Sequence, residues 1–144
     1  MLVSGSNIGT DLWDQVYPGG ADSLYQARAQ RFAQEVLGYK WLTNYADVKG
    51  GVRFLPGGPL SGKAFTYLRG DDGISWGAGT VDGLSPACDK AQIFLRFSQN
   101  SIPTGILFDG NGYKAASIGF PLETIDNEKD MQRVLTTILT YFRR

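Results

Sequence analysis

One segment near the N-terminus has residue types and a spacing suited to binding a polar group. After an apolar strand predicted at residues 2–4, the chain reads Gly5-Ser6-Asn7-Ile8-Gly9. A strand that leads through such a turn into a helix has the form of a nucleophile elbow, whose backbone N–H groups can hold an anion or stabilise an oxyanion. The middle residue is Asn7, whose amide is not the usual nucleophile but tolerates left-handed backbone angles. The pattern predicts either a plain glycine-rich turn or a retained binding turn, with these candidate binding residues: Ser6, Asn7, Thr10 and Asp11.

A second candidate segment lies near the C-terminus. It reads Gly119-Phe120-Pro121-Leu122-Glu123-Thr124, ends an apolar strand and leads towards the last helix. The Glu123 carboxylate is suited to orienting a base, holding a ligand hydroxyl or capping backbone N–H groups. Capping or an ion pair is the simpler interpretation, and Glu123 joins the candidate binding residues.

Other polar clusters lack the spacing of known sites. The acids Asp71, Asp72, Asp82 and Asp89 do not follow a calcium-loop pattern, so we interpret them as solvated loop acids. The segment 57–64 contains Gly-Lys but lacks the full phosphate-loop spacing. We therefore expect no metal and no cofactor.

Trp76 is the best candidate for a sugar-stacking residue, because aromatic faces on loops bind glycans and its surroundings are rich in glycine. Packing against this domain or a neighbouring one is the simpler alternative. The single cysteine, Cys88, has no histidine to activate it, and we expect an inert, half-buried thiol.

Composition excludes several function classes. The chain has 144 residues, no histidine, one cysteine and a formal net charge of +0. Catalytic triads with histidine, histidine-bound metals and intramolecular disulfides are therefore excluded within this chain. A balanced charge argues against nucleic acid as a partner. No apolar run approaches the roughly 20 residues that span a bilayer, so membrane insertion is not expected.

The elements that must position these residues follow from periodicity and turn signals. Helices are predicted at 11–16, with Thr10 as N-cap, at 22–37 and from Asp126 or Asn127 to the C-terminus. In the second helix, Tyr25, Ala29, Phe32, Ala33, Val36 and Leu37 form the expected apolar face, and Gly38 ends it. In the last helix, the expected apolar face is Met131, Val134, Leu135, Ile138, Leu139 and Phe142.

Strands are predicted at 2–4, at 52–55 as an edge strand, and at 64–68, 93–97, 104–108 and 113–119. The last two are joined by Asp109-Gly110-Asn111-Gly112, a strong signal for an antiparallel hairpin. Residues 70–87 contain five glycines and are expected to form a long surface loop.

This order predicts one α/β domain over residues 1–144. The expected architecture is a three-layer Rossmann-like or flavodoxin-like fold, with a mixed sheet, a C-terminal antiparallel hairpin and helices packed on the sheet. Because the chain starts directly in a strand, we expect it to be a fragment of a larger protein.

The two candidate segments together resemble those of class I glutamine amidotransferase-like domains. That family has a Gly-x-Cys-x-Gly elbow and, after a later strand, Phe-His-Pro-Glu. Here Asn7 stands at the cysteine, Pro121 at the histidine and Glu123 at the glutamate, so only the glutamate remains. The resemblance implies the fold without the amidotransferase chemistry.

A closer resemblance covers residues 2–12 and 118–125, with Phe32, Leu37, Tyr39 and Trp41 between them. These segments are similar to a Rossmann-like domain of bacterial secreted multidomain proteins that are often labelled xanthan lyases. The resemblance implies a non-catalytic accessory or structural domain of a secreted or cell-envelope protein. Its partners would be the neighbouring domains of the parent chain and, in a polysaccharide-related protein, a polysaccharide.

Two alternatives stay open at this point. One is a hydrolase or polysaccharide lyase that acts through Glu123, Asp11 and a tyrosine. The other is a carbohydrate-binding module that uses Trp76.

Overall fold

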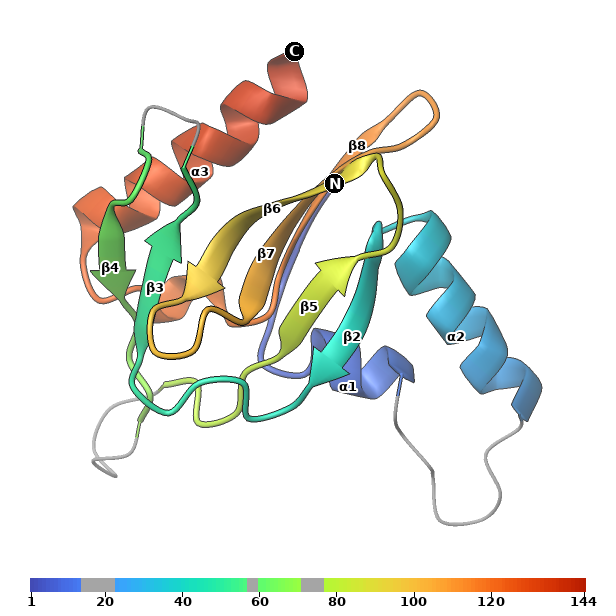
Figure 1. The fold of residues 1–144 in the computed structure, drawn as a ribbon, viewed down its shortest axis with the longest axis horizontal. Helices are drawn as coiled ribbons and strands as arrows, with labels where there is room; N and C mark the ends of the chain where they lie inside the picture. Colours follow the sequence, from blue (N-terminus) through green and yellow to red (C-terminus); the bar gives the residue numbers. More distant parts are fainter. Residues whose placement is uncertain (14–22, 57–59, 71–76) are drawn as a thin grey trace.

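The computed structural model describes residues 1–13, 23–56, 60–70 and 77–144, and it has a mixed α/β fold (Figure 1). Its elements follow in this order: β1 (Leu2–Ser4), α1 (Ile8–Trp13), α2 (Ser23–Glu35), β2 (Tyr39–Thr43), β3 (Gly51–Phe54), β4 (Ala64–Thr66), β5 (Gly83–Pro86), β6 (Ala91–Phe97), β7 (Pro103–Asp109), β8 (Lys114–Ile118), the 3-10 helix η1 (Leu122–Thr124) and α3 (Glu128–Arg143).

Six of the strands form one curled mixed sheet in the order β1-β8-β7-β6-β3-β4. The short strand β1 runs parallel to β8, with Val3 opposite Ser117, whereas the other pairings in this sheet are antiparallel. The predicted hairpin is confirmed: β7 and β8 pair from Gly105 opposite Ile118 to Asp109 opposite Lys114. The predicted edge strand at 52–55 was wrong in its position, since β3 lies between β4 and β6 and β4 is the outer strand.

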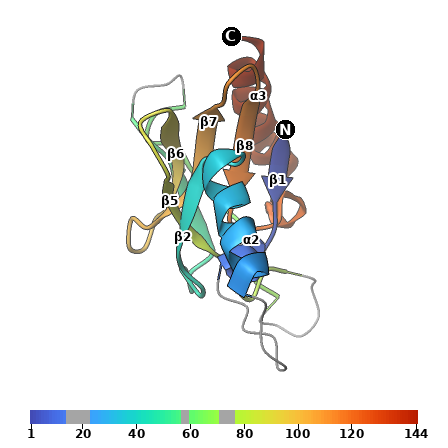
Figure 2. The same cartoon turned by 90° about the vertical axis from the view of Figure 1, so that its right-hand side faces the viewer.

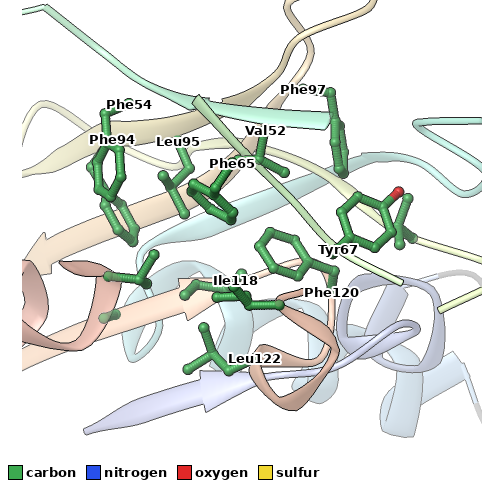
Figure 3. Close-up of a cluster of buried hydrophobic side chains, with 14 of the residues drawn as sticks. Val52, Phe54, Phe65, Tyr67, Phe94, Leu95, Phe97, Ile118, Phe120 and Leu122 are labelled. Carbon is green, nitrogen blue, oxygen red and sulfur yellow. The ribbon is translucent and has the colours of Figure 1, made fainter. Parts of the chain in front are cut away.

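A cluster of aromatic and aliphatic side chains fills the concave side of the sheet (Figure 3). Phe120 lies at its centre, stacked on Tyr67 with ring centroids 5.1 Å apart, and also contacts Phe65 and Phe97. Helix α3 adds the buried residues Val134 and Ile138 to this cluster. Burying each such large apolar side chain contributes about 1.5–3 kcal/mol, so this cluster holds the curled sheet on α3.

The other face of β7 and β8 is covered by α2 and by a separate ribbon of β2 and β5 (Figure 2). Alternation along β8 explains the two cores, because Ala116 and Ile118 belong to the cluster beneath α3 while Ala115 belongs to the opposite one. The helices thus pack on the sheet as predicted.

The prediction of one continuous loop over 70–87 was wrong. Gly83–Pro86 is strand β5, which pairs antiparallel with β2, and Leu84 is fully buried. A Cβ on Gly83 would lie 2.7 Å from Cγ2 of Ile102, so this glycine permits close packing rather than a turn. Strand β2 itself, at Tyr39–Thr43, was not predicted.

Helix α2 ends as predicted near Gly38, which has a φ of 77°. Its expected apolar face is only partly correct, because Ala33 and Leu37 are buried whereas Tyr25 and Phe32 are 58% and 44% exposed. Helix α2 therefore buries a narrower face than its apolar spacing predicts.

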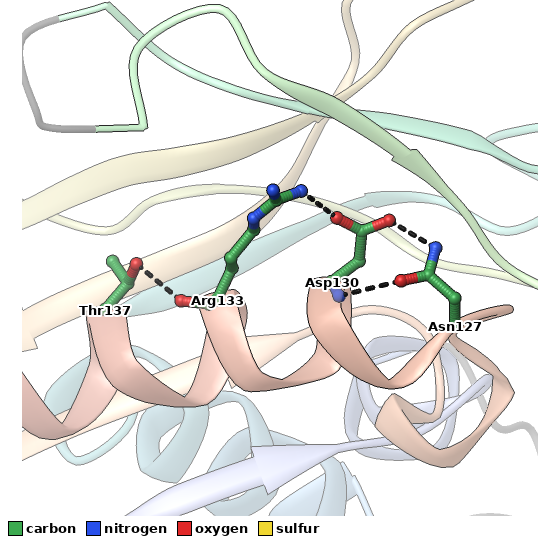
Figure 4. A network of polar contacts seen from close by, with 4 residues as sticks. All are labelled: Asn127, Asp130, Arg133 and Thr137. Carbon is green, nitrogen blue, oxygen red and sulfur yellow. Dashed lines mark hydrogen bonds and ion pairs between the residues drawn. The ribbon is translucent and has the colours of Figure 1, made fainter.

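The predicted C-terminal helix, capped by Asp126 or Asn127, is confirmed by α3. Asn127 is its N-cap, and the Asn127 side chain accepts a hydrogen bond from the backbone N–H of Asp130 at 3.0 Å (Figure 4). Within the predicted apolar face, Leu139 is exposed.

Candidate functional site

The turn after β1 lies beside the end of β8. The parallel pairing of β1 and β8 brings them together, and the backbone N–H of Gly5 donates to the carbonyl oxygen of Ile118 at 3.2 Å. Helix α1 then starts at Ile8, two residues before the predicted N-cap Thr10, so Thr10 lies inside the helix. Residues 14–16 of the predicted helix lie outside the described residues.

Asn7 sits in this turn without backbone strain. Among the described residues that are not glycine, only Tyr45 and Ser101 have a positive φ, so Asn7 does not adopt the left-handed conformation that asparagine tolerates. The Asn7 side chain is exposed, and its Oδ1 accepts a hydrogen bond from the Thr80 hydroxyl at 3.2 Å. The turn therefore lacks the strained projection that a nucleophile elbow requires.

The residue at the centre of this region is Asp82, whose glycine-rich sequence context favours the interpretation of a solvated loop acid. That interpretation was wrong, because Asp82 is 0% exposed. Its Oδ2 accepts hydrogen bonds from the backbone N–H groups of Gly9 and Thr10, at 2.7 and 3.3 Å. Its Oδ1 accepts from the Thr10 hydroxyl at 2.8 Å and from Nε1–H of Trp41 at 3.1 Å.

These four donors occupy the hydrogen-bond acceptor positions of the Asp82 carboxylate. An ionised aspartate offers about four lone-pair positions on its two oxygens, and each Asp82 oxygen receives two hydrogen bonds. Taking a proton from a substrate would require one of these bonds to break. The arrangement is therefore suited to holding α1 against β2, and not to general-base chemistry.

The backbone of Asp82 extends this connection to the sheet. Its N–H donates to the carbonyl oxygen of Gly119 at 2.8 Å, and its carbonyl oxygen accepts from the Thr104 hydroxyl at 3.3 Å. A Cβ on Gly119 would lie 2.2 Å from that same carbonyl oxygen, so Gly119 permits the close approach. Asp82 thus links α1, β2, β7 and the end of β8.

Burial dominates the electrostatics of the region. Loss of solvent raises the pKa of Asp82 above its usual value, although the hydrogen bonds from Thr10, Gly9 and Trp41 each act to lower it. Burial, together with the nearby Asp82 charge, raises the pKa of the Tyr39 hydroxyl well above its usual range. That hydroxyl donates to the carbonyl oxygen of Ile8 at 2.9 Å, so Tyr39 also anchors α1.

Gly9 explains why the turn ends in glycine. A Cβ at this position would lie 2.4 Å from Cδ1 of Trp41 and 3.3 Å from Oδ2 of Asp82. The glycine serves the packing of α1 on Trp41 and Asp82, not a left-handed turn.

The remaining candidate residues do not join this cluster. Ser6 is half-buried, and Asp11 and Glu123 are exposed, the latter in η1. Trp76, like Asp71 and Asp72, lies outside the described residues. Asp89 is exposed, and Cys88 is also exposed, so the expected half-burial of its thiol was wrong.

Two surface cavities lie elsewhere: a hollow of about 510 Å³ beside Met1 and Tyr113, and a groove of about 750 Å³ beside α3. Neither Asp11 nor Glu123 lines them. Within the described residues, no group of three or more acidic or cysteine side chains is placed to hold a metal ion.

The sequence contains a signal that Asp82 is buried. The aspartate stands between Val81 and Gly83-Leu84, in an apolar context that is unusual for a solvated acid. Its partners are 41 and 72 residues away in the chain, so the cluster itself could not be read from local spacing.

Fold and site together define a mixed α/β domain in which a buried aspartate fastens the first helix to the sheet. Comparisons with protein-family models, curated proteins and solved structures give no match for this chain. None of the helices in the described residues is long and apolar enough to cross a bilayer.

Proposed function

We propose that this chain is a non-catalytic accessory or structural domain of a larger secreted or cell-envelope bacterial protein, with a fold like that of class I glutamine amidotransferases. Its partners would be the neighbouring domains of the parent chain, with a polysaccharide as a further partner if the parent acts on one. The three-layer Rossmann-like arrangement belongs to this proposal. The parallel pair β1–β8 supports it, whereas the antiparallel β3, β4, β6 and β7 depart from a parallel Rossmann sheet.

The non-catalytic role is supported by the backbone conformation of Asn7 and by the hydrogen bonds of Asp82. Asn7 occupies the position of the nucleophile in an unstrained turn, and the nearby buried carboxylate is saturated by four hydrogen bonds. The chain has no histidine to transfer a proton. The hydrolase or lyase alternative would need Glu123 and Asp11 to act in one cleft, and both side chains are exposed.

The proposal is tested by incubating the purified chain with glutamine and measuring ammonia release. We expect the same rate for the wild-type chain, for Asn7→Ala and for buffer alone. Saturable release that is lost in Asn7→Ala while the fold is retained would contradict the proposal. A polysaccharide array probed with the wild-type chain and with Trp76→Ala tests the carbohydrate-binding alternative, which requires binding that depends on Trp76.

A further inference from the structure

The groove beside α3 has an apolar floor. It lies between α3, the end of β3 with the residues that follow it, and β6, and its volume is about 750 Å³. Phe54, Phe94 and Leu107 belong to the core beneath α3, and each keeps 5–8% of its surface exposed while lining the groove. Small-molecule sites are typically concave, mostly apolar and of about 300–1,000 Å³, so the groove has the size and character of such a site.

The helical wall of the groove is polar. Thr136 and Thr140 lie one turn apart on α3 and are exposed, and Thr137 also lines the groove. The charged side chains that line it within the described residues are Lys129, Arg133 and Arg144, all of them cationic. An anionic group would therefore find complementary charge along this wall.

A chain of polar contacts holds Arg133 in place. Figure 4 shows its guanidinium pointing from α3 towards the strands, with Nη1 donating to Oδ1 of Asp130 at 2.6 Å. The other Asp130 oxygen accepts from the side-chain amide of Asn127, the N-cap residue. Asp130 offsets part of the Arg133 charge, but a guanidinium has five N–H donors, so further donors stay available to a ligand.

We propose that this groove binds a small anionic amphiphile, namely a molecule with an aliphatic tail and a carboxylate head. The tail would lie over Phe54, Phe94 and Leu107. The head would accept charge-assisted hydrogen bonds from Arg133 and Lys129. This inference is independent of the function proposed for the turn at Asn7, because none of the residues there lines the groove.

The test is an NMR titration of the ¹⁵N-labelled chain with decanoate below its micellar concentration and with 1-decanol, its uncharged analogue. We expect saturable shifts at Ile93, Thr136 and Thr140, and tighter binding of decanoate than of decanol. In Lys129→Gln/Arg133→Gln the affinity for decanoate should fall about tenfold while that for decanol stays unchanged, since charge-assisted hydrogen bonds are lost.

Arg143→Gln is the matched control, because it removes one cation from the same helix outside the groove lining. Its affinity for decanoate should equal that of the wild-type chain. Absence of saturable binding, equal affinity for decanoate and decanol, shifts confined to other surfaces, or binding only to phosphatidylglycerol vesicles would each overturn the proposal. If the double variant fails to fold, the wild-type shift map and the preference for decanoate over decanol decide the question.

Discussion

The Thr10 hydroxyl donates a hydrogen bond of 2.8 Å to the carboxylate of Asp82, which lies 72 residues further along the chain. Through this bond and the two backbone donors of α1, the first helix is fixed to a buried carboxylate. Asp82 therefore fixes α1 to the rest of the fold.

Thr10→Val should lower the free energy of unfolding by about 1–3 kcal/mol. Valine keeps the shape of threonine but leaves a buried carboxylate oxygen with one hydrogen bond fewer. Urea denaturation followed by circular dichroism measures the change. Thr10→Ser, which keeps the hydroxyl, and Thr140→Val, at an exposed position of α3, should both cost much less. Equal losses for Thr10→Val and Thr140→Val would mean that the hydroxyl does not hold the helix.

Gly9→Ala should destabilise the fold by about 1–3 kcal/mol, because the added methyl group would overlap the Trp41 ring. The matched control is Gly79→Ala, where a Cβ meets its nearest neighbour at 3.8 Å and φ is not positive. The control should leave the free energy of unfolding nearly unchanged. If the two variants unfold at the same urea concentration, the close packing of α1 on Trp41 is not as described.

The raised pKa of Asp82 predicts a definite pH dependence. Because the folded state holds the Asp82 proton more tightly than the unfolded state, this group stabilises the fold most below the unfolded pKa. Its contribution is lost as pH rises through the folded pKa. The free energy of unfolding of the wild-type chain, relative to that of Asp82→Asn, should therefore fall as the pH rises from the unfolded pKa of Asp82 through its folded pKa. An NMR titration of the ¹³C-labelled carboxyl that gave a pKa below the usual aspartate value would show the opposite sign.

Cys88 should react in the folded protein. Its side chain is exposed, so Ellman's reagent should modify one thiol per chain under native conditions, at a rate close to that in urea. Cys88→Ser should give no signal. A thiol that reacts only after unfolding would contradict the exposure of Cys88 and would favour the half-burial expected from the sequence.

The sequence predicted those elements that depend on residues close to one another in the chain. The turn Asp109-Gly110-Asn111-Gly112 joins β7 to β8, and the apolar repeat with its cap at Asn127 gives α3. The contact between the turn after β1 and the end of β8 was not predicted, because it depends on the pairing of β1 with β8, two strands far apart in the chain.

Long-range contacts explain what the sequence did not predict. Strand β5 was not predicted, because glycine is typical of loops. Gly83 instead permits close packing against Ile102. The role of Asp82 depends on Gly9, Thr10 and Trp41, which only the folded chain brings together. A local pattern shows an acid in a glycine-rich segment, but not the donors that surround it.

The most direct test of the non-catalytic role is covalent labelling by a diazoketone analogue of glutamine, which traps the nucleophile of amidotransferases. The Cys88→Ser chain is used so that the exposed thiol does not react, and the intact mass is measured after incubation. We predict an unmodified mass, because Asn7 is no nucleophile and the Asp82 carboxylate is saturated. A stoichiometric adduct that maps to residues 5–10 or to Asp82 would contradict the account.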